Sequence, residues 1–154
     1  MDIIEELKGV VTRLAEAGVD YALCGGLAMA VYAMPRATLD IDLMIQIASI
    51  DDAARAIEPL GFTMSSAPME FHEGDIRISP FTKVDPQSGE VMVLDFLLVT
   101  EKTTPAWESR QDFEWEGTKL RVVSPEGLIQ LKELRGSGVD KDDIDYLRSI
   151  TDED

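Results

Sequence analysis

Apolar residues recur at helical spacing near both ends of the chain. Residues 2–17 form an amphipathic segment that predicts a helix ending near Gly18. Toward the other end, Ser124-Pro125 is typical of a helix start, so residues 126–135 are predicted to be helical. A further amphipathic segment over residues 141–150 predicts a last helix.

Short apolar runs in the middle of the chain predict strands. One strand is expected over residues 21–24 and another over residues 39–47, with a short buried helix over residues 27–34 between them. The most apolar run, residues 91–99, is predicted to be a central strand buried on both faces. The other predicted elements are a helix over 49–60, short strands over 61–64, 71–73 and 76–81, a surface loop over 103–107 and a peripheral hairpin over 113–123.

The composition is that of an ordinary globular protein. Of the 154 residues, 45% are hydrophobic and 29% are charged, which predicts a single domain over residues 1–154. We expect its core over about residues 19–100 and a helical part over about residues 124–150. No apolar run reaches the roughly 18 residues of a membrane span, and the acidic start does not resemble a secretory signal. The single cysteine, Cys24, cannot form an internal disulfide, so we expect a cytoplasmic protein without membrane contact.

The formal net charge of −16 restricts the partners of the molecule. An acidic surface repels the phosphates of nucleic acids, and the 14 Lys and Arg residues are scattered along the chain. Stand-alone binding of DNA or RNA is therefore disfavoured. Nucleotides carried as magnesium complexes remain suitable substrates, because the metal offsets much of their charge.

Gly25 and Gly26 follow the first predicted strand directly. Paired glycines at this place allow a tight turn and close packing of a helix against a strand. They also allow the backbone to approach a phosphate, whose oxygens the N–H groups at the helix start would bind. The glycines alone favour the first interpretation, and both stay open.

Two carboxylates lie on one face of the second predicted strand. Asp40 and Asp42 are two residues apart, so they share a face and lie roughly 7 Å from each other. Asp is a poor strand former, and two unpaired carboxylates at this distance repel each other. They either project into water or share a cation.

Asp95 lies inside the most apolar run of the chain. A carboxylate in such a strand costs several kcal/mol unless it is paired, metal-bound or protonated. If this strand lies beside the strand of Asp40 and Asp42, the three acids make a three-carboxylate metal site. The alternative is a buried Asp95 neutralised by a basic residue, with three candidates in Arg36, Arg77 and Lys119.

These segments together resemble a known signature. Residues 21–26, a spacer of thirteen residues after Gly26, and Asp40-Ile41-Asp42-Leu43 resemble the motif of the polymerase-beta-like nucleotidyltransferase superfamily. Residues 123–132, with Arg135 and residues 141–144, look like the branch that contains AbiEii-type abortive-infection toxins and related minimal nucleotidyltransferases. The resemblance implies an α+β fold (two α/β layers) with a mixed β-sheet flanked by helices and with C-terminal helices.

The resemblance also implies an activity. The chain would move a nucleoside monophosphate from a nucleoside triphosphate to a hydroxyl acceptor, with two Mg²⁺ ions and with Mn²⁺ as an alternative. Asp40 and Asp42 would bind both ions, and Asp95 would bind one ion and help to deprotonate the acceptor hydroxyl.

Other residues would bind the nucleotide in this scheme. The backbone of Gly25 and Gly26 would hold the β- and γ-phosphates, and Thr38 would orient an Asp. Lys132 would neutralise phosphate charge, and Arg36 would either do the same or pair with a carboxylate.

The acceptor and the biological role stay open at this point. The acceptor is RNA, a protein side chain or a small molecule, and the acidic surface disfavours RNA. A homodimer or a partner protein would complete the acceptor pocket of so short a chain. Two alternatives are a catalytically silent nucleotide-binding or toxin–antitoxin module of the same fold, and an acidic α/β domain whose Asp cluster binds Ca²⁺.

Overall fold

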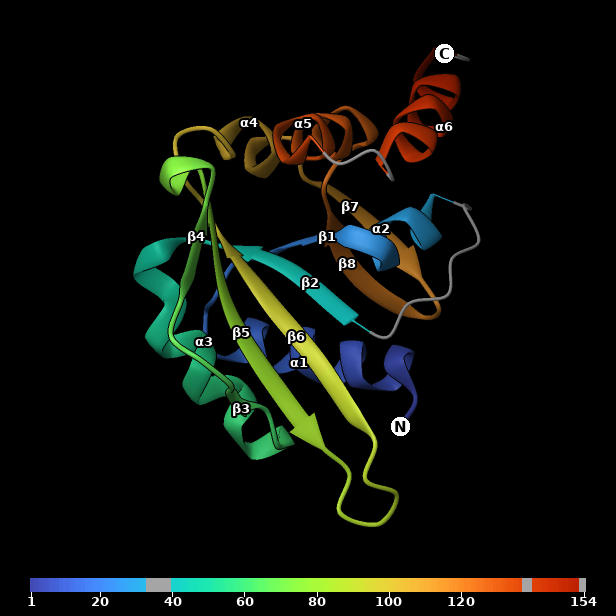
Figure 1. Cartoon of the computed structure of the whole chain (residues 1–154). Coiled ribbons are helices and arrows are strands. Elements are labelled where there is room, and N and C mark those ends of the chain that lie inside the picture. Colours follow the sequence, from blue (N-terminus) through green and yellow to red (C-terminus); the bar gives the residue numbers. More distant parts are fainter. Residues whose placement is uncertain (33–39, 137–139, 153–154) are drawn as a thin grey trace.

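The computed structural model describes residues 1–32, 40–136 and 140–152. Its helices lie at the two ends and on the faces of one twisted sheet (Figure 1). The α-helices are α1 (Ile3–Glu16), α2 (Gly25–Val31), α3 (Ile50–Ile57), α4 (Thr104–Glu108), α5 (Pro125–Arg135) and α6 (Asp140–Asp152). The strands are β1 (Ala22–Cys24), β2 (Asp40–Ile45), β3 (Thr63–Met64), β4 (Met69–Phe71), β5 (Ile76–Val84), β6 (Val91–Leu98), β7 (Gln111–Trp115) and β8 (Thr118–Val122).

The sheet is mixed, as expected. Its strand order is β3-β5-β6-β2-β1-β8-β7, and β4 pairs with β5. β2 runs parallel to β6 and β1 runs parallel to β8, whereas the other pairs are antiparallel. The predicted α+β class, with a mixed sheet flanked by helices and with helices at the C-terminal end, is confirmed.

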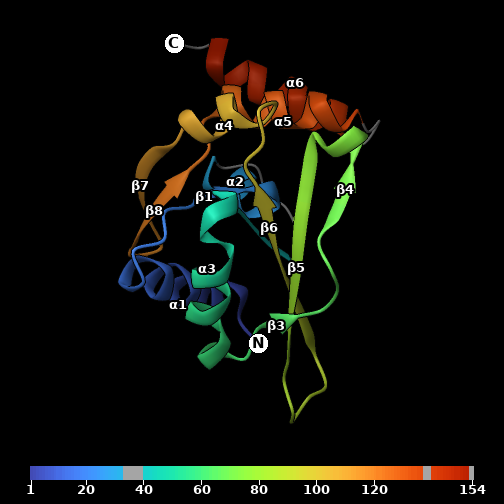
Figure 2. The same ribbon diagram turned by 90° about the vertical axis from the view of Figure 1, so that its left-hand side faces the viewer.

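The core lies between the sheet and the helices that pack on it, with α1 as a large contributor. The amphipathic pattern of α1 places Leu7, Val10 and Leu14 inside, where they are at most 1% exposed. Ile41 and Leu43 of β2 are fully buried in the same cluster. Figures 1 and 2 show α1 and α3 along the lower half of the sheet and α4, α5 and α6 grouped at its upper end.

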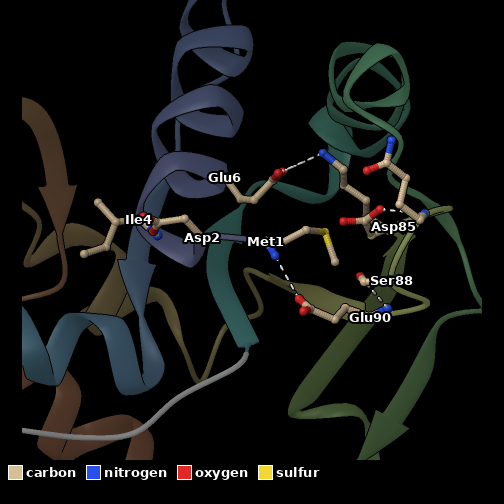
Figure 3. Close-up of polar contacts among 9 residues, drawn as sticks. Met1, Asp2, Ile4, Glu6, Asp85, Ser88 and Glu90 are labelled. Carbon is tan, nitrogen blue, oxygen red and sulfur yellow. Dashed lines mark hydrogen bonds and ion pairs between the residues drawn. The ribbon is translucent and has the colours of Figure 1, made fainter.

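Contacts near the start of α1 fix this helix to the hairpin formed by β5 and β6 (Figure 3). The Met1 amino group donates to Glu90 Oε2 at 2.8 Å. The Lys83 ammonium donates to both carboxylate oxygens of Glu6, at 2.8 and 2.9 Å. Asp2 caps the helix, because its Oδ1 accepts from the backbone N–H of Ile4 at 2.9 Å.

The segment after β6 differs from the sequence prediction. Residues 103–107 were expected to form a surface loop, but Thr104–Glu108 is the short helix α4. Thr103 and Ala106 are fully buried there, and Thr103 Oγ1 accepts from the backbone N–H of Thr100 at 2.8 Å. This tertiary burial, together with Pro105 in the first turn, outweighs the turn-forming composition.

The strand predicted to be buried on both faces, β6, is buried on one face only. Met92, Leu94 and Phe96 are at most 5% exposed, whereas the alternate residues Val93 and Asp95 are half-buried. The strand is nevertheless internal in the sheet, between β5 and β2. The partly open face is the one that carries Asp95.

The predicted peripheral hairpin is confirmed as the antiparallel pair of β7 and β8. Glu116 and Gly117 both have positive φ, 51° and 76°, which is the pattern of a two-residue type I′ turn. The segment predicted as one helix over residues 49–60 consists of α3 flanked by two 3₁₀ turns, Ile47–Ser49 and Glu58–Leu60.

None of the helices in the described ranges has the length and apolarity that crossing a membrane requires.

Candidate functional site

Asp42 and Asp95 are direct neighbours across the parallel pair of β2 and β6. Their Cα atoms are register partners, as are those of Asp40 and Val93. Because side chains alternate along a strand, Asp40 and Asp42 project from the same face, on the side of Asp95. The condition set for the three-carboxylate hypothesis, that the two strands lie side by side, is therefore met, and three carboxylates lie on one face of adjacent strands.

The pKa values of Asp42 and Asp95 are both raised. Burial raises the pKa of Asp42 to about 7, and the negative charges of Asp95 and Asp40 add to this effect. The positive charges of Arg135 and Lys132 oppose it. Burial and the charge of Asp40 also raise the pKa of Asp95. Burial and neighbouring negative charge thus disfavour the charged forms of Asp42 and Asp95, an effect that a bound cation would relieve.

Gly25 packs directly on Asp42. Its φ is +69°, and a Cβ at this position would lie 2.2 Å from Asp42 Oδ2 and 2.8 Å from its Cγ. Only glycine fits both the left-handed backbone and this distance. The close approach of helix and strand, one of the two interpretations of the glycine pair, is what the structure has, and the role in phosphate binding stays a prediction.

The glycine pair lies inside the helix rather than before it. The helix was expected to begin at Leu27, but α2 begins at Gly25, with Cys24 at its N-cap position. Gly26 is the second helical residue and is half-buried. Leu27 and Met29 are buried, as expected of a helix that is apolar nearly all round.

A small cavity lies over the carboxylates and reaches α5. Its volume is about 130 Å³. Four charged residues, Asp42, Asp95, Lys132 and Arg135, contribute to its lining, and most of the others are apolar. The lining residues are Cys24, Gly25, Asp42, Ile76, Ile78, Asp95, Leu97, Thr103, Leu128, Leu131, Lys132 and Arg135. The larger open groove of about 1060 Å³ between α1 and the hairpin of β7 and β8 is lined by other residues.

The helix α5 supplies the positively charged side chains that line the cavity. Ser124 caps it as predicted, because its Oγ accepts from the backbone N–H of Gly127 at 3.0 Å. Lys132 and Arg135 lie three residues apart on one face of α5, and both line the cavity. The α5 helix thus places two positive charges opposite the carboxylates of β2 and β6.

Sequence reasoning missed Asp143. This residue of α6 is 3% exposed, and its Oδ2 accepts from Lys132 Nζ at 2.9 Å. The only signal in the sequence is its position four residues before the buried Leu147, which places both on the inner face of the helix.

The basic residues considered as partners of Asp95 are placed elsewhere or fall outside the described ranges. Arg77 Nε lies 3.4 Å from Glu70 Oε1, and Lys119 of β8 lines the groove beside α1. Arg36 and Thr38, predicted to act on phosphate and on an Asp, lie outside the described residues. Of these candidates, neither Arg77 nor Lys119 supports the ion-pair alternative.

The donor chemistry of the site suits a hard divalent cation, because carboxylate oxygens are the ligands that Mg²⁺ prefers. Among the described residues, however, no three His, Cys, Asp or Glu side chains are arranged so that they could hold one ion. The backbone register therefore brings Asp42 and Asp95 together, with Asp40 on the same face, while the side chains do not converge as a ligand set.

The fold is similar to that of solved nucleotidyltransferases. A nucleotidyltransferase candidate from Thermotoga maritima superposes with a TM-score of 0.67 at 16% identity, over 99% of this chain and 94% of that one. The lincosamide antibiotic adenylyltransferase LnuA superposes with a TM-score of 0.63 at 17% identity, over 95% and 96% of the two chains. The antibiotic-resistance factor ANT(2″)-Ia gives 0.65 at 17% identity, over 96% and 83%.

Sequence comparison alone does not find these similarities. No protein-family model matches the chain, and no curated protein sequence matches it. The structural likeness, which extends over nearly the whole chain, shows that the chain has the nucleotidyltransferase fold.

Proposed function

We propose that this protein is a Mg²⁺-dependent nucleotidyltransferase that moves a nucleoside monophosphate from a nucleoside triphosphate to a hydroxyl acceptor. The observation that carries the proposal is the pairing of Asp42 with Asp95, in register on β2 and β6 and beside Gly25, within a nucleotidyltransferase fold. A carboxylate pair with raised pKa values in a cavity is typical of a functional site.

The acidic residues would hold the metal and the proton. Asp40, Asp42 and Asp95 would bind Mg²⁺, which when bound offsets the charge of the triphosphate and polarises its α-phosphate. Asp95 would take the proton of the acceptor hydroxyl, whose oxygen forms a bond to the α-phosphorus while the bond to the leaving pyrophosphate breaks. Asp95 lines the cavity beside its register partner Asp42, where an acceptor hydroxyl would approach its carboxylate.

The basic residues and the glycines would bind the phosphates. Lys132 and Arg135 line the cavity opposite the carboxylates, where their charges would offset those of the triphosphate. The backbone of Gly25 and Gly26 would approach the phosphates at the start of α2. Arg36 and Thr38, between α2 and β2 in the sequence, keep their predicted roles as part of this proposal.

A small molecule is the acceptor that we favour. ANT(2″)-Ia has been crystallised with adenylyl-2″-tobramycin and LnuA with lincomycin, and both have the fold of this chain. The net charge of −16 disfavours RNA. The cavity of about 130 Å³ is smaller than pockets that hold a whole ligand, so a second copy or a partner protein would complete the acceptor side. A toxin–antitoxin role, the AbiEii-type branch and a cytoplasmic location belong to the same proposal.

The experiment is transfer of label from α-³²P-labelled nucleoside triphosphates, with pyrophosphate release measured in parallel. Lincomycin, tobramycin, RNA and the protein itself would be offered as acceptors. We expect Mg²⁺-dependent release of pyrophosphate with one acceptor class, and no release from Asp95→Asn. Label transfer that persists in Asp95→Asn would overturn the assignment of the proton acceptor.

A second candidate is a nucleotide-binding module without turnover. It is favoured by the described side chains, among which no group of three metal ligands is in place. Tight binding of a nucleoside triphosphate, with no pyrophosphate release for any acceptor, would identify this function.

A further inference from the structure

Lys132 and Asp143 form an ion pair that is almost completely enclosed. Lys132 Nζ lies 2.9 Å from Asp143 Oδ2, and the side chains of the two residues are 11% and 4% exposed. Lys132 lines the cavity over Asp42 and Asp95. Asp143, on the neighbouring helix α6, contacts Lys132 and is not itself part of the cavity lining. Asp143 can therefore affect the cavity indirectly, through its ion pair with Lys132.

The helix α6 contacts two walls of the same cavity. It packs against α5, and the Tyr146 hydroxyl donates to the backbone carbonyl of Tyr32, the C-cap of α2, at 2.7 Å. Tyr32 in turn donates from its hydroxyl to the carbonyl of Val123, just before α5. These hydrogen bonds fix α2, α5 and α6 to one another. The helix that carries Asp143 is therefore held in place relative to Lys132 of α5.

We propose that Asp143 is a positioning residue, which holds the ammonium of Lys132 at the cavity in the orientation that binds the phosphates of the substrate. This inference rests on the proposed function. A lysine side chain has several rotatable bonds, and fixing it when the ligand binds costs conformational entropy. A buried carboxylate that fixes one of the ammonium's three N–H donors in advance removes part of that cost. Enclosure also requires that the ammonium have a charged partner, and Asp143 is one.

A second ion pair between the same helices supplies a matched control. Arg148 Nη2 of α6 lies 2.6 Å from Glu133 Oε1 of α5, but both side chains are more than half exposed. Glu133 is adjacent to Lys132 in sequence and lies on the outer side of α5. A change at Glu133 therefore removes an α5–α6 ion pair without touching the cavity.

The test is calorimetric binding of MgATP, MgGTP and magnesium tripolyphosphate to the full chain. We expect Asp143→Asn to weaken binding about tenfold or more, as changes in residues that support a binding group do. Asp143→Glu should restore part of this loss, and Glu133→Gln should bind as the wild type does. In a Lys132→Gln background, Asp143→Asn should have no further effect on affinity. A merely structural role would produce the same additional loss in both backgrounds.

Several results would overturn the inference. If a folded Asp143→Asn variant binds as tightly as the wild type or more tightly, Asp143 does not position Lys132. If Asp143→Asn does not fold, the apolar pair Lys132→Met/Asp143→Leu, which replaces both charges, is compared with Lys132→Met. Equal affinities support the inference, and a further loss in the double variant contradicts it.

The same measurement separates this inference from the proposed function. One outcome is that the wild type binds tripolyphosphate but neither nucleotide, while Asp143→Asn still weakens binding only when Lys132 is present. In that case Lys132 and Asp143 organise an anion site, and the proposed function fails. If the wild type binds nucleotide, and Asp143→Asn has the same effect on affinity with and without Lys132→Gln, only the inference fails. If it binds none of the three probes, both are wrong.

Discussion

At Gly25 the backbone has a φ of +69°, and an added Cβ would lie 2.2 Å from Asp42 Oδ2. We expect Gly25→Ala to lower the free energy of unfolding by about 2–4 kcal/mol, combining backbone strain with a collision. Gly18→Ala is the control, because Gly18 has a φ of +73° but nothing within 4 Å of the added Cβ. Urea denaturation of both variants measures the difference. Equal losses would show that Asp42 does not press on Gly25.

The protonation of Asp42 should make stability depend on pH. Its pKa is raised from 3.8 in the unfolded chain to about 7 in the folded protein. The folded state therefore holds a proton that the unfolded state has lost between these pH values, and stability falls as pH rises through this window. The shift corresponds to at most about 4 kcal/mol.

Asp42→Asn should remove this dependence. In the absence of metal, we expect the variant to gain stability relative to the wild type as pH rises from about 4 to about 7, and to keep the gain at pH 8. Asp51→Asn, which removes the same charge from an exposed position in α3, is the matched control. Urea denaturation at each pH is the measurement. A difference between wild type and Asp42→Asn that is flat with pH would contradict the account.

For single residues, the sequence predicted candidate site residues where a residue type is unusual for the secondary structure that surrounds it. Asp40, Asp42 and Asp95 stand out because carboxylates are rare in apolar strands, and Gly25 stands out beside Gly26. Asp143 does not stand out, because it lies in an acidic helix where a carboxylate ordinarily faces water. Its burial depends on a lysine in another helix, and sequence pattern does not carry that contact.

At the scale of elements, Gly127 determines how α5 packs on α4. A Cβ there would lie 2.3 Å from Ser109 Oγ, 2.6 Å from Val123 Cγ1 and 3.2 Å from Ala106 Cα. We expect Gly127→Ala to destabilise the protein by about 1–3 kcal/mol, although alanine is the better helix former. The variant should also weaken nucleotide binding, because α5 carries Lys132.

Gly9 in α1 is the matched control for Gly127. A Cβ at Gly9 would meet only Leu60 Cδ1 and Cδ2, at 3.7 and 3.8 Å, which is ordinary contact. We therefore expect Gly9→Ala to stabilise the protein by about 0.5–1 kcal/mol. Thermal unfolding of both variants gives the signs, and destabilisation by Gly9→Ala or stabilisation by Gly127→Ala would contradict this packing.

Helices and strands that are marked by capping residues, turn residues or alternation could be predicted from the sequence. Elements that depend on burial by distant parts of the chain could not. The start of α5 follows from Ser124-Pro125, and the hairpin of β7 and β8 follows from its alternation around Gly117. The helix α4 was missed because its turn-forming residues are helical only where Thr103 and Ala106 are enclosed. Single-face burial of β6 was missed because the apolar run conceals which side faces the cavity.

At the scale of the whole molecule, the net charge of −16 should oppose folding through self-repulsion. Raising the NaCl concentration from about 0.01 M to about 0.15 M shortens the Debye length from about 30 Å to about 8 Å. We expect the melting temperature to rise by a few degrees over this range, as measured by circular dichroism. A fall would indicate that surface ion pairs such as that of Arg148 and Glu133 outweigh the repulsion.

The order of the strands in the sheet could not be predicted from the sequence, which only set a condition on it. The metal-site hypothesis required the strand of Asp95 to lie beside that of Asp42, and sequence pattern does not pair strands that are about fifty residues apart. The structure supplies the parallel register that meets this condition. The single-domain organisation, the bound metal and the acceptor stay predictions.

Calorimetric titration of nucleoside triphosphates in the presence and absence of Mg²⁺ tests the central claim most directly. The wild type is compared with the double variant Asp40→Asn/Asp42→Asn, which keeps the size of both side chains. We predict that the wild type binds only with Mg²⁺ and that binding disappears in the double variant. Binding that needs no metal, or that survives in the double variant, would contradict the account of β2 and β6 as the metal and nucleotide site.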